Sequence, residues 1–140
     1  MKICGALAAG AAMVALGACA TAEDRLVETG YVQLTSAEIT TVFVGNTILG
    51  KGRVSDYAIY YANAEELRGR ITWEDNAATD HGVWEVTAED TYCRRWLERW
   101  GNPERQCWRI YRSGDTITWV DPDGSISTQT TLLVGNAKGL

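Results

Sequence analysis

The segment Leu67-Arg-Gly-Arg-Ile-Thr-Trp73 decides the fold class, because its apolar and polar residues alternate with a period of two. One face of an extended chain would carry Leu67, Ile71 and Trp73, and the other Arg68, Arg70 and Thr72. This alternation is typical of a β-strand with one face in the core and the other in water. Val83-Trp-Glu-Val-Thr87 alternates in the same way, so the pattern predicts a largely β protein.

Short strands and turns continue outward from this segment. Further strands are predicted at 56–61, 91–96, 107–112, 116–120 and 125–134. Turn-forming residues separate them at 62–63, 89–90, 113–115 and 121–124. Seven or eight strands joined by hairpins form an antiparallel meander. We expect it to close into a small barrel or a curled sandwich, because closure hides the strand edges.

Two segments precede the strands. Thr35-Ser-Ala-Glu38 has the pattern of a capping box, which predicts one short N-terminal helix over 36–44 with Gly45 as its left-handed end. Residues 20–30 have weak periodicity and are interpreted as a short flexible tether with an average reach of about 17–20 Å. The predicted organisation is a signal at 1–18, a lipidated cysteine and tether at 19–30, and a single β-domain at 31–140.

The N-terminus has the pattern of a bacterial secretion signal, with Lys2 followed by an apolar run from Ile3 to Gly17. Leu16-Gly-Ala-Cys19 resembles the lipobox of bacterial lipoproteins. This resemblance implies cleavage before Cys19 and acylation of that residue, and Ala20 in the next position implies sorting to the outer membrane. The alternative is an ordinary signal cut at Ala20 or Ala22, which would release the protein into the periplasm.

Charge and cysteine usage limit the function further. Loss of Lys2 with the signal takes the formal net charge from −5 to −6, and an acidic exported domain has no general reason to bind nucleic acid. Once Cys19 carries lipid, Cys93 and Cys107 remain as a pair in an oxidising compartment, where we expect a disulfide. It would close a loop of about 15 residues, worth about 3 kcal/mol.

Residues 93–112 differ in composition from the rest of the chain, because six arginines and two glutamates give them a net charge of +4. Trp96 and Trp100 are spaced i, i+4, as in a helical turn that 101–103 would end. One interpretation makes the tryptophans a lid on the barrel end. The other makes the segment a binding surface for an anionic envelope component, formed by Arg94, Arg95, Trp96, Arg99, Trp100 and Arg105.

The sequence contains no set of residues typical of catalysis, metal binding or cofactor binding. His81 is the only histidine and falls in the polar run 74–81, which is interpreted as a loop. Asp121-Pro-Asp-Gly124 resembles the start of a calcium loop, but strand pattern resumes at once, so a hairpin turn is favoured. We therefore expect no enzyme activity and no cofactor.

Gly82-Val-Trp84 matches the short G-x-W signature of lipocalin-like barrels. Lipocalins carry it in their first strand, whereas here it lies in the middle of the chain. The number of predicted strand residues is small, so the barrel would be narrow and its interior would be filled by side chains. Trp73, Trp84, Trp119, Tyr57, Ile59 and Tyr61 are predicted to belong to that core.

Several short motifs together resemble a family of small uncharacterised exported domains of Gram-negative bacteria, over residues 33–140. These motifs are 34–39, 45–47, 56–61, 82–84, 92–96, 107–111 and 134–140. The resemblance supports the β fold and the Cys93–Cys107 bridge, and it leaves the function open. The sequence thus predicts a non-enzymatic outer-membrane lipoprotein with a binding or structural role. The alternative is a calycin-like carrier of a small apolar ligand.

Overall fold

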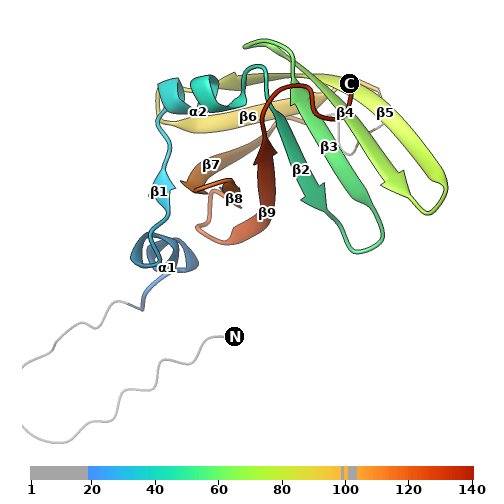
Figure 1. Cartoon of the computed structure of the whole chain (residues 1–140). Coiled ribbons are helices and arrows are strands. Elements are labelled where there is room, and N and C mark those ends of the chain that lie inside the picture. Colours follow the sequence, from blue (N-terminus) through green and yellow to red (C-terminus); the bar gives the residue numbers. More distant parts are fainter. Residues whose placement is uncertain (1–18, 99, 101–103) are drawn as a thin grey trace, which may run out of the picture.

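The computed structural model describes residues 19–98, 100 and 104–140. The predicted signal, Arg99 and the predicted stop at 101–103 lie outside the described residues. Within them the chain forms two short helices and nine strands (Figure 1). In order these are α1 (Ala22–Glu28), β1 (Val32–Gln33), α2 (Ser36–Phe43), β2 (Thr47–Lys51), β3 (Asp56–Tyr61), β4 (Glu66–Trp73), β5 (Asn76–Val86), β6 (Thr91–Trp96), β7 (Gln106–Ser113), β8 (Thr116–Val120) and β9 (Ile126–Leu133).

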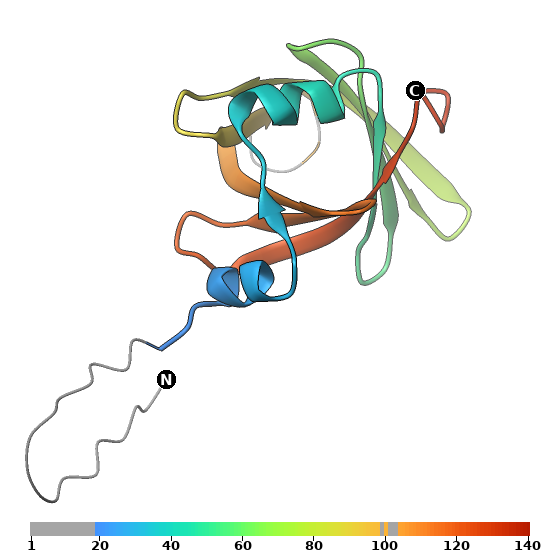
Figure 2. The ribbon, with the colours of Figure 1, turned by 60° about the vertical axis from the view of Figure 1, so that its left-hand side comes forward.

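Strands β2 to β9 form an antiparallel meander that closes on itself, because β2 pairs with both β3 and β9. The two-residue strand β1 pairs with the end of β7, beyond the part of β7 that pairs with β6. Figure 2 shows the strands surrounding a central space. The predicted small β-barrel is confirmed.

Consecutive strands run in opposite directions, so alternate turns gather at opposite ends of the barrel. Helix α2 lies at the end that holds the β5–β6 turn, where the Ser36 amide donates to Asp90 Oδ1 at 2.7 Å. Helix α1 lies at the other end, since a Cβ at Gly124 in the β8–β9 turn would be 3.6 Å from Glu23 Oε2. The β2–β3, β4–β5 and β6–β7 connections share this α1 end.

The predicted N-terminal helix is confirmed as α2. The Thr35 hydroxyl accepts from the Glu38 amide at 3.3 Å, and Glu38 Oε2 accepts from the Thr35 amide at 2.8 Å. These reciprocal bonds satisfy two amides that the first helical turn leaves unpaired. Gly45 follows with φ +78°, as predicted, and Ile39 and Phe43 are fully buried in the core.

The prediction of a flexible tether at 20–30 is wrong, because residues 22–28 form α1. Thr21 caps this helix by a second capping box, with Asp24 Oδ2 accepting from the Thr21 amide at 2.7 Å. Leu26 is buried with Tyr111 and Val120 on the outside of the barrel. A seven-residue helix has too little periodicity to be evident in sequence, and its docking to the barrel stabilises it.

Two strands differ from the prediction. β2 is a strand that the sequence does not predict, and β5 begins at Asn76, inside the run interpreted as a polar loop. His81 is therefore a strand residue. Trp73, predicted in the core, is 38% exposed because it ends β4 at the tip of the β4–β5 hairpin. The other predicted core residues are buried, with Tyr57 partly so.

None of the helices in the described part of the chain is both long enough and apolar enough to cross a membrane.

Candidate functional site

The basic segment predicted to bind a partner is divided between the two faces of the barrel wall. Along β6, Tyr92, Arg94 and Trp96 face the interior and Cys93 and Arg95 face outward, because successive side chains of a strand alternate. Segment 91–96 is a strand, as predicted. The predicted helical turn from Trp96 to Trp100 includes Arg99, which lies outside the described residues. The segment forms part of the wall, and its two faces have different chemistry.

Aromatic rings fill the interior. Phe43 contacts Tyr61, Trp84, Tyr92 and Trp119, with ring centroids 4.8–6.2 Å apart. The hydroxyls of Tyr61 and Tyr92 are hydrogen-bonded at 3.0 Å, and burial raises the pKa of both phenols. Both groups therefore stay neutral.

Arg94 lies among these rings instead of on an exposed recognition face, which corrects its predicted placement. Its guanidinium carbon is 4.8 Å from the ring centroid of Trp108, 5.5 Å from that of Trp96 and 5.6 Å from that of Trp119. These are cation–π distances, and Arg94 Nε is buried without a hydrogen-bond partner among the described residues. The cation is held by ring faces, so Arg94 is part of the packing.

The tryptophans of the segment close the α1 end of the barrel. The rings of Trp96 and Trp100 meet edge to face at 4.6 Å. They cover Gly69 so closely that a Cβ there would collide with the ring of Trp100. The Asp80 carboxylate holds this arrangement, accepting from the backbone amides of Trp100 at 2.7 Å and Glu98 at 3.2 Å. The positions of these two tryptophans therefore agree with the lid interpretation.

Asp80, His81 and Glu98 bring potential metal-ligand atoms within 4.8 Å of one another. Asp80 is buried, whereas His81 and Glu98 are exposed and lie 3.5 Å apart at Nδ1 and Oε1. The Asp80 oxygens already accept three backbone amides, those of His81, Glu98 and Trp100. The chemistry of the group therefore fits closure of the barrel end better than ion binding.

A groove of about 780 Å³ runs along the outer face of β5 and β6. Its lining includes Val83, Glu85, Arg95 and Arg105, together with Cys93 of the Cys93–Cys107 bridge. Val83 is 41% exposed, and Arg105 Nη2 lies 2.6 Å from Glu85 Oε1. Arg95 has no ion pair among the described residues. The groove thus offers apolar surface and the guanidinium of Arg95, unpaired among the described residues, and Glu65 lines it as well.

Cys93 and Cys107 face each other on β6 and β7 and form the predicted disulfide. The bridge lies at the start of the pairing between these strands, beside the connection that carries Trp100. It therefore fixes the base of the segment that closes the barrel.

Helix α1, which follows Cys19, is docked on the barrel wall. Arg109 on β7 donates to both carboxylate oxygens of Glu23, at 2.7 and 2.8 Å, and the Tyr111 hydroxyl donates to Glu23 Oε1 at 2.6 Å. The Arg109 hydrogen bonds lower the pKa of Glu23, while burial and the Glu23 contact raise the pKa of Tyr111 to about 12. Cys19 is exposed two residues before the cap of this docked helix.

The structure brings together only part of the predicted site. Arg95 and Arg105 share the outer groove, which Arg94 also borders, but the Arg94 guanidinium, Trp96 and Trp100 belong to the interior and its closure. Residues that sequence reasoning missed are Glu23 and Val83. The Thr21-x-x-Asp24 capping pattern was the available sign of the helix that positions Glu23.

Comparison with known protein families, with curated proteins and with solved structures finds no match.

Proposed function

We propose that the protein is a non-enzymatic outer-membrane lipoprotein whose barrel binds an acidic segment of another envelope protein in the β5–β6 groove. The observation that carries this proposal is the division of the basic segment. Its inward residues are used in packing, whereas Arg95 and Arg105 remain on an outer surface beside exposed Val83. Arginine beside apolar surface is the composition of binding hot spots.

The docking of α1 supports the anchored part of the proposal. A lipid on Cys19 would be joined to the barrel through a packed helix, so the barrel would stay at the membrane surface with its α1 end toward the lipid. Val54, 81% exposed in the β2–β3 connection, and Trp73 lie at this same end. Tryptophan is favoured at membrane interfaces, which agrees with this orientation.

The partner's chemistry follows from the groove. The exposed Arg105–Glu85 pair contributes no more than about 1 kcal/mol, so a partner carboxylate can replace Glu85 at little cost. Arg95 supplies a second cation, and the exposed Val83 supplies apolar contact. An acidic segment with apolar side chains fits this combination better than a polar anion does.

The anchor is tested by metabolic labelling of cells with a fatty-acid analogue. The wild-type chain should be labelled and membrane-bound, and Cys19→Ser should lose both the label and the membrane association. Labelling that persists in Cys19→Ser would disprove the anchor.

The groove is tested by photo-crosslinking in cells from a photoreactive amino acid at position 83. A discrete adduct should form, should weaken as salt rises in isolated membranes, and should be lost in Arg95→Glu with Arg105→Glu. The matched control is Arg53→Glu with Arg68→Glu, which reverses two exposed arginines outside the groove. Equal loss in the control, or no adduct from position 83, would refute the groove as the binding surface.

A further inference from the structure

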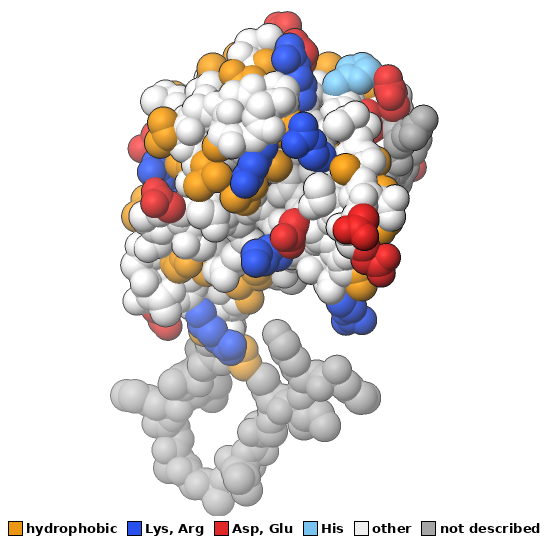
Figure 3. Space-filling model, turned by 45° about the vertical axis from the view of Figure 1, so that its right-hand side comes forward, with side chains coloured by type: hydrophobic (Ala, Val, Ile, Leu, Met, Phe, Trp, Pro, Cys, Tyr) orange, Lys and Arg blue, Asp and Glu red, His pale blue; other side chains and the backbone are white. Residues whose placement is uncertain are grey.

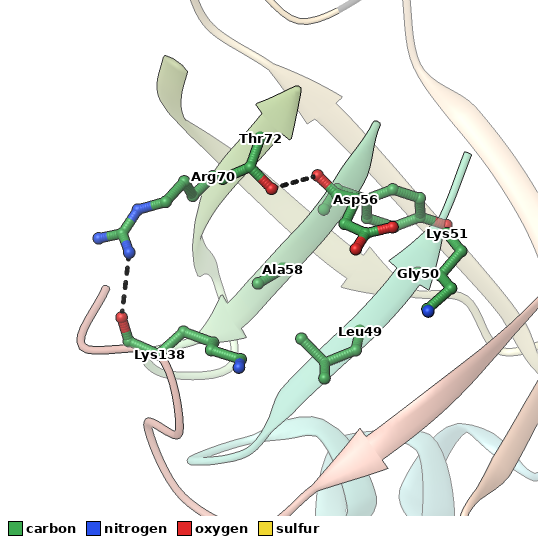
Figure 4. Close-up of a pocket in the computed structure, with 9 residues that line it drawn as sticks. Leu49, Gly50, Lys51, Asp56, Ala58, Arg70, Thr72 and Lys138 are labelled. Carbon is green, nitrogen blue, oxygen red and sulfur yellow. Dashed lines mark hydrogen bonds between the residues drawn. The ribbon is translucent and has the colours of Figure 1, made fainter. Parts of the chain in front are cut away.

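A second hollow, of about 240 Å³, lies on the outer face of β2, β3 and β4. Leu49 and Ala58 face each other across β2 and β3, and Arg70 on β4 is the next residue in the same row. Lys51, Asp56 and Thr72 form the parallel row. The C-terminal segment folds back over this face, where Arg70 Nη1 donates to the Lys138 carbonyl at 3.4 Å (Figure 4).

Three cations from distant parts of the chain therefore surround one hollow. Lys51 and Lys138 are the only lysines that follow the predicted signal, and both line it together with Arg70. In Figure 4 the ammonium groups of the two lysines lie on either side of Leu49 and are turned toward each other. In Figure 3 basic and apolar side chains intermingle at the centre of this side of the barrel.

These cations lack counter-charges. Within residues 19–98, 100 and 104–140, no carboxylate lies within 4.0 Å of Lys51, Arg70 or Lys138. Asp56, the cross-strand partner of Lys51, lines the hollow but stays beyond this distance, so the lining carries a net charge of +2. Like charges gathered on an otherwise acidic protein repel one another, and a bound anion would relieve that repulsion.

The shape of the hollow limits the anion to a small one. Ala58 is a small residue at the centre of the face, between Leu49 and Arg70, and this leaves the depression. Its volume is below the roughly 300–1,000 Å³ of pockets for drug-sized ligands. The guanidinium of arginine matches the oxygens of phosphate in pairs, and lysine acts as a point charge on the same group.

We infer that this hollow binds a phosphate group, either free or at the end of a phosphomonoester. A phosphate dianion balances the net charge of +2, whereas a carboxylate would balance half of it. Arg70 and the two lysines would contact the oxygens, and the Thr72 hydroxyl, which donates to the Asp56 carbonyl at 3.3 Å, is within the same lining. This binding site is separate from the β5–β6 groove and independent of the proposed partner.

The test is a titration of the isotope-labelled full chain, in neutral detergent, followed by amide chemical shifts. Inorganic phosphate and the soluble lipid dihexanoyl phosphatidic acid are the two probes, with acetate and dihexanoyl phosphatidylcholine as charge controls. We expect saturable shifts at Ala58, Arg70 and Lys138 with phosphate or with the phosphatidic acid. Which probe saturates at the lower concentration identifies the source of the phosphate group.

Variants connect the binding to the three cations. Arg70→Ala should weaken binding about tenfold or more, Arg70→Lys less, and Lys51→Ala and Lys138→Ala each several-fold, all with the melting temperature unchanged. Arg68→Ala is the matched control, since Arg68 lies on the same face of β4 but is paired with Glu66 at 3.0 Å. Absence of saturation with both probes, or equal weakening by Arg68→Ala, would overturn the inference.

Discussion

Two regions of this barrel gather basic side chains, and they differ in whether those side chains already have partners. In the 93–112 segment, Arg94 lies over aromatic rings, Arg105 pairs with Glu85 and Arg109 with Glu23, so that among these arginines Arg95 is the exception, with no ion pair to a described residue. In the hollow on β2, β3 and β4, no carboxylate of the described part of the chain lies within 4.0 Å of Lys51, Arg70 or Lys138. The 93–112 segment has the most basic residues along the sequence, yet it leaves fewer cations available to bind a partner.

The difference follows from strand geometry. A dense basic run on a strand places alternate residues on opposite faces, so about half of its charges turn toward the interior. Lys51 and Arg70 come together when β2, β3 and β4 form consecutive hairpins, and Lys138 joins them when the C-terminal segment folds back. The density of charged residues along a sequence therefore describes composition alone. Whether a charged side chain can bind a partner depends on which face of the strand it occupies and on which groups surround it.

The largest change in stability is expected when the disulfide is removed. Cys93→Ala with Cys107→Ala should lower the free energy of unfolding by about 2–5 kcal/mol, because the bridge restricts the unfolded chain and joins β6 to β7. Denaturant unfolding measures this, with the wild-type protein under reducing conditions as a parallel. An intact mass that corresponds to two unoxidised thiols in envelope-derived protein would contradict the assignment.

A smaller effect is expected where α1 docks. Arg109→Ala should cost about 1–2 kcal/mol and release α1, measured by amide exchange of Leu26, because Glu23 loses the two hydrogen bonds from Arg109. Arg112→Ala is the control on the same strand, since Arg112 bonds only a turn carbonyl, that of Gly114. Equal exchange at Leu26 in the two variants would mean that the pair does not hold the helix.

The same contact predicts a pH dependence. The pKa of Glu23 is lowered by folding, so its contribution to stability is present above its usual pKa of 4.5 and is lost as pH falls through the folded value. The pKa of Tyr111 is raised from 10 to about 12, so its contribution is present below pH 10 and lost between pH 10 and 12. The protection factor of the Leu26 amide, which removes the intrinsic pH dependence of exchange, should therefore fall at both extremes, and a flat protection profile would argue against the contact.

Much of the fold could be predicted from the sequence, because one-sided burial leaves a period of two in β4 and β6 to β9. The first half of β5 could not, since Asn76 to Thr79 belong to a hairpin exposed on both faces, which leaves no apolar alternation. β2 has Gly50 at an inward position, where the ring of Tyr57 fills the space of a side chain. The strand therefore lacks an apolar residue at that position.

The sites were harder to predict than the strands. The alternation of β6 was sufficient to place Arg94 with Tyr92 and Trp96, but only a closed interior shows that rings from β7 and β8 receive its cation. The hollow depends on Lys138 reaching Arg70 across 68 positions of sequence, through a C-terminal segment that folds back. No local pattern carries that information.

The most direct test of the division between the two faces compares neighbouring residues, Arg94 and Arg95. Thermal unfolding of Arg94→Glu should show a loss of at least about 2 kcal/mol, because a carboxylate would be set against the negative faces of three tryptophan rings without a counter-charge. Arg95→Glu should change stability by less than about 0.5 kcal/mol, as exposed substitutions usually do. Equal losses in the two variants, or the larger loss in Arg95→Glu, would contradict the inward placement of Arg94 and the outward placement of Arg95.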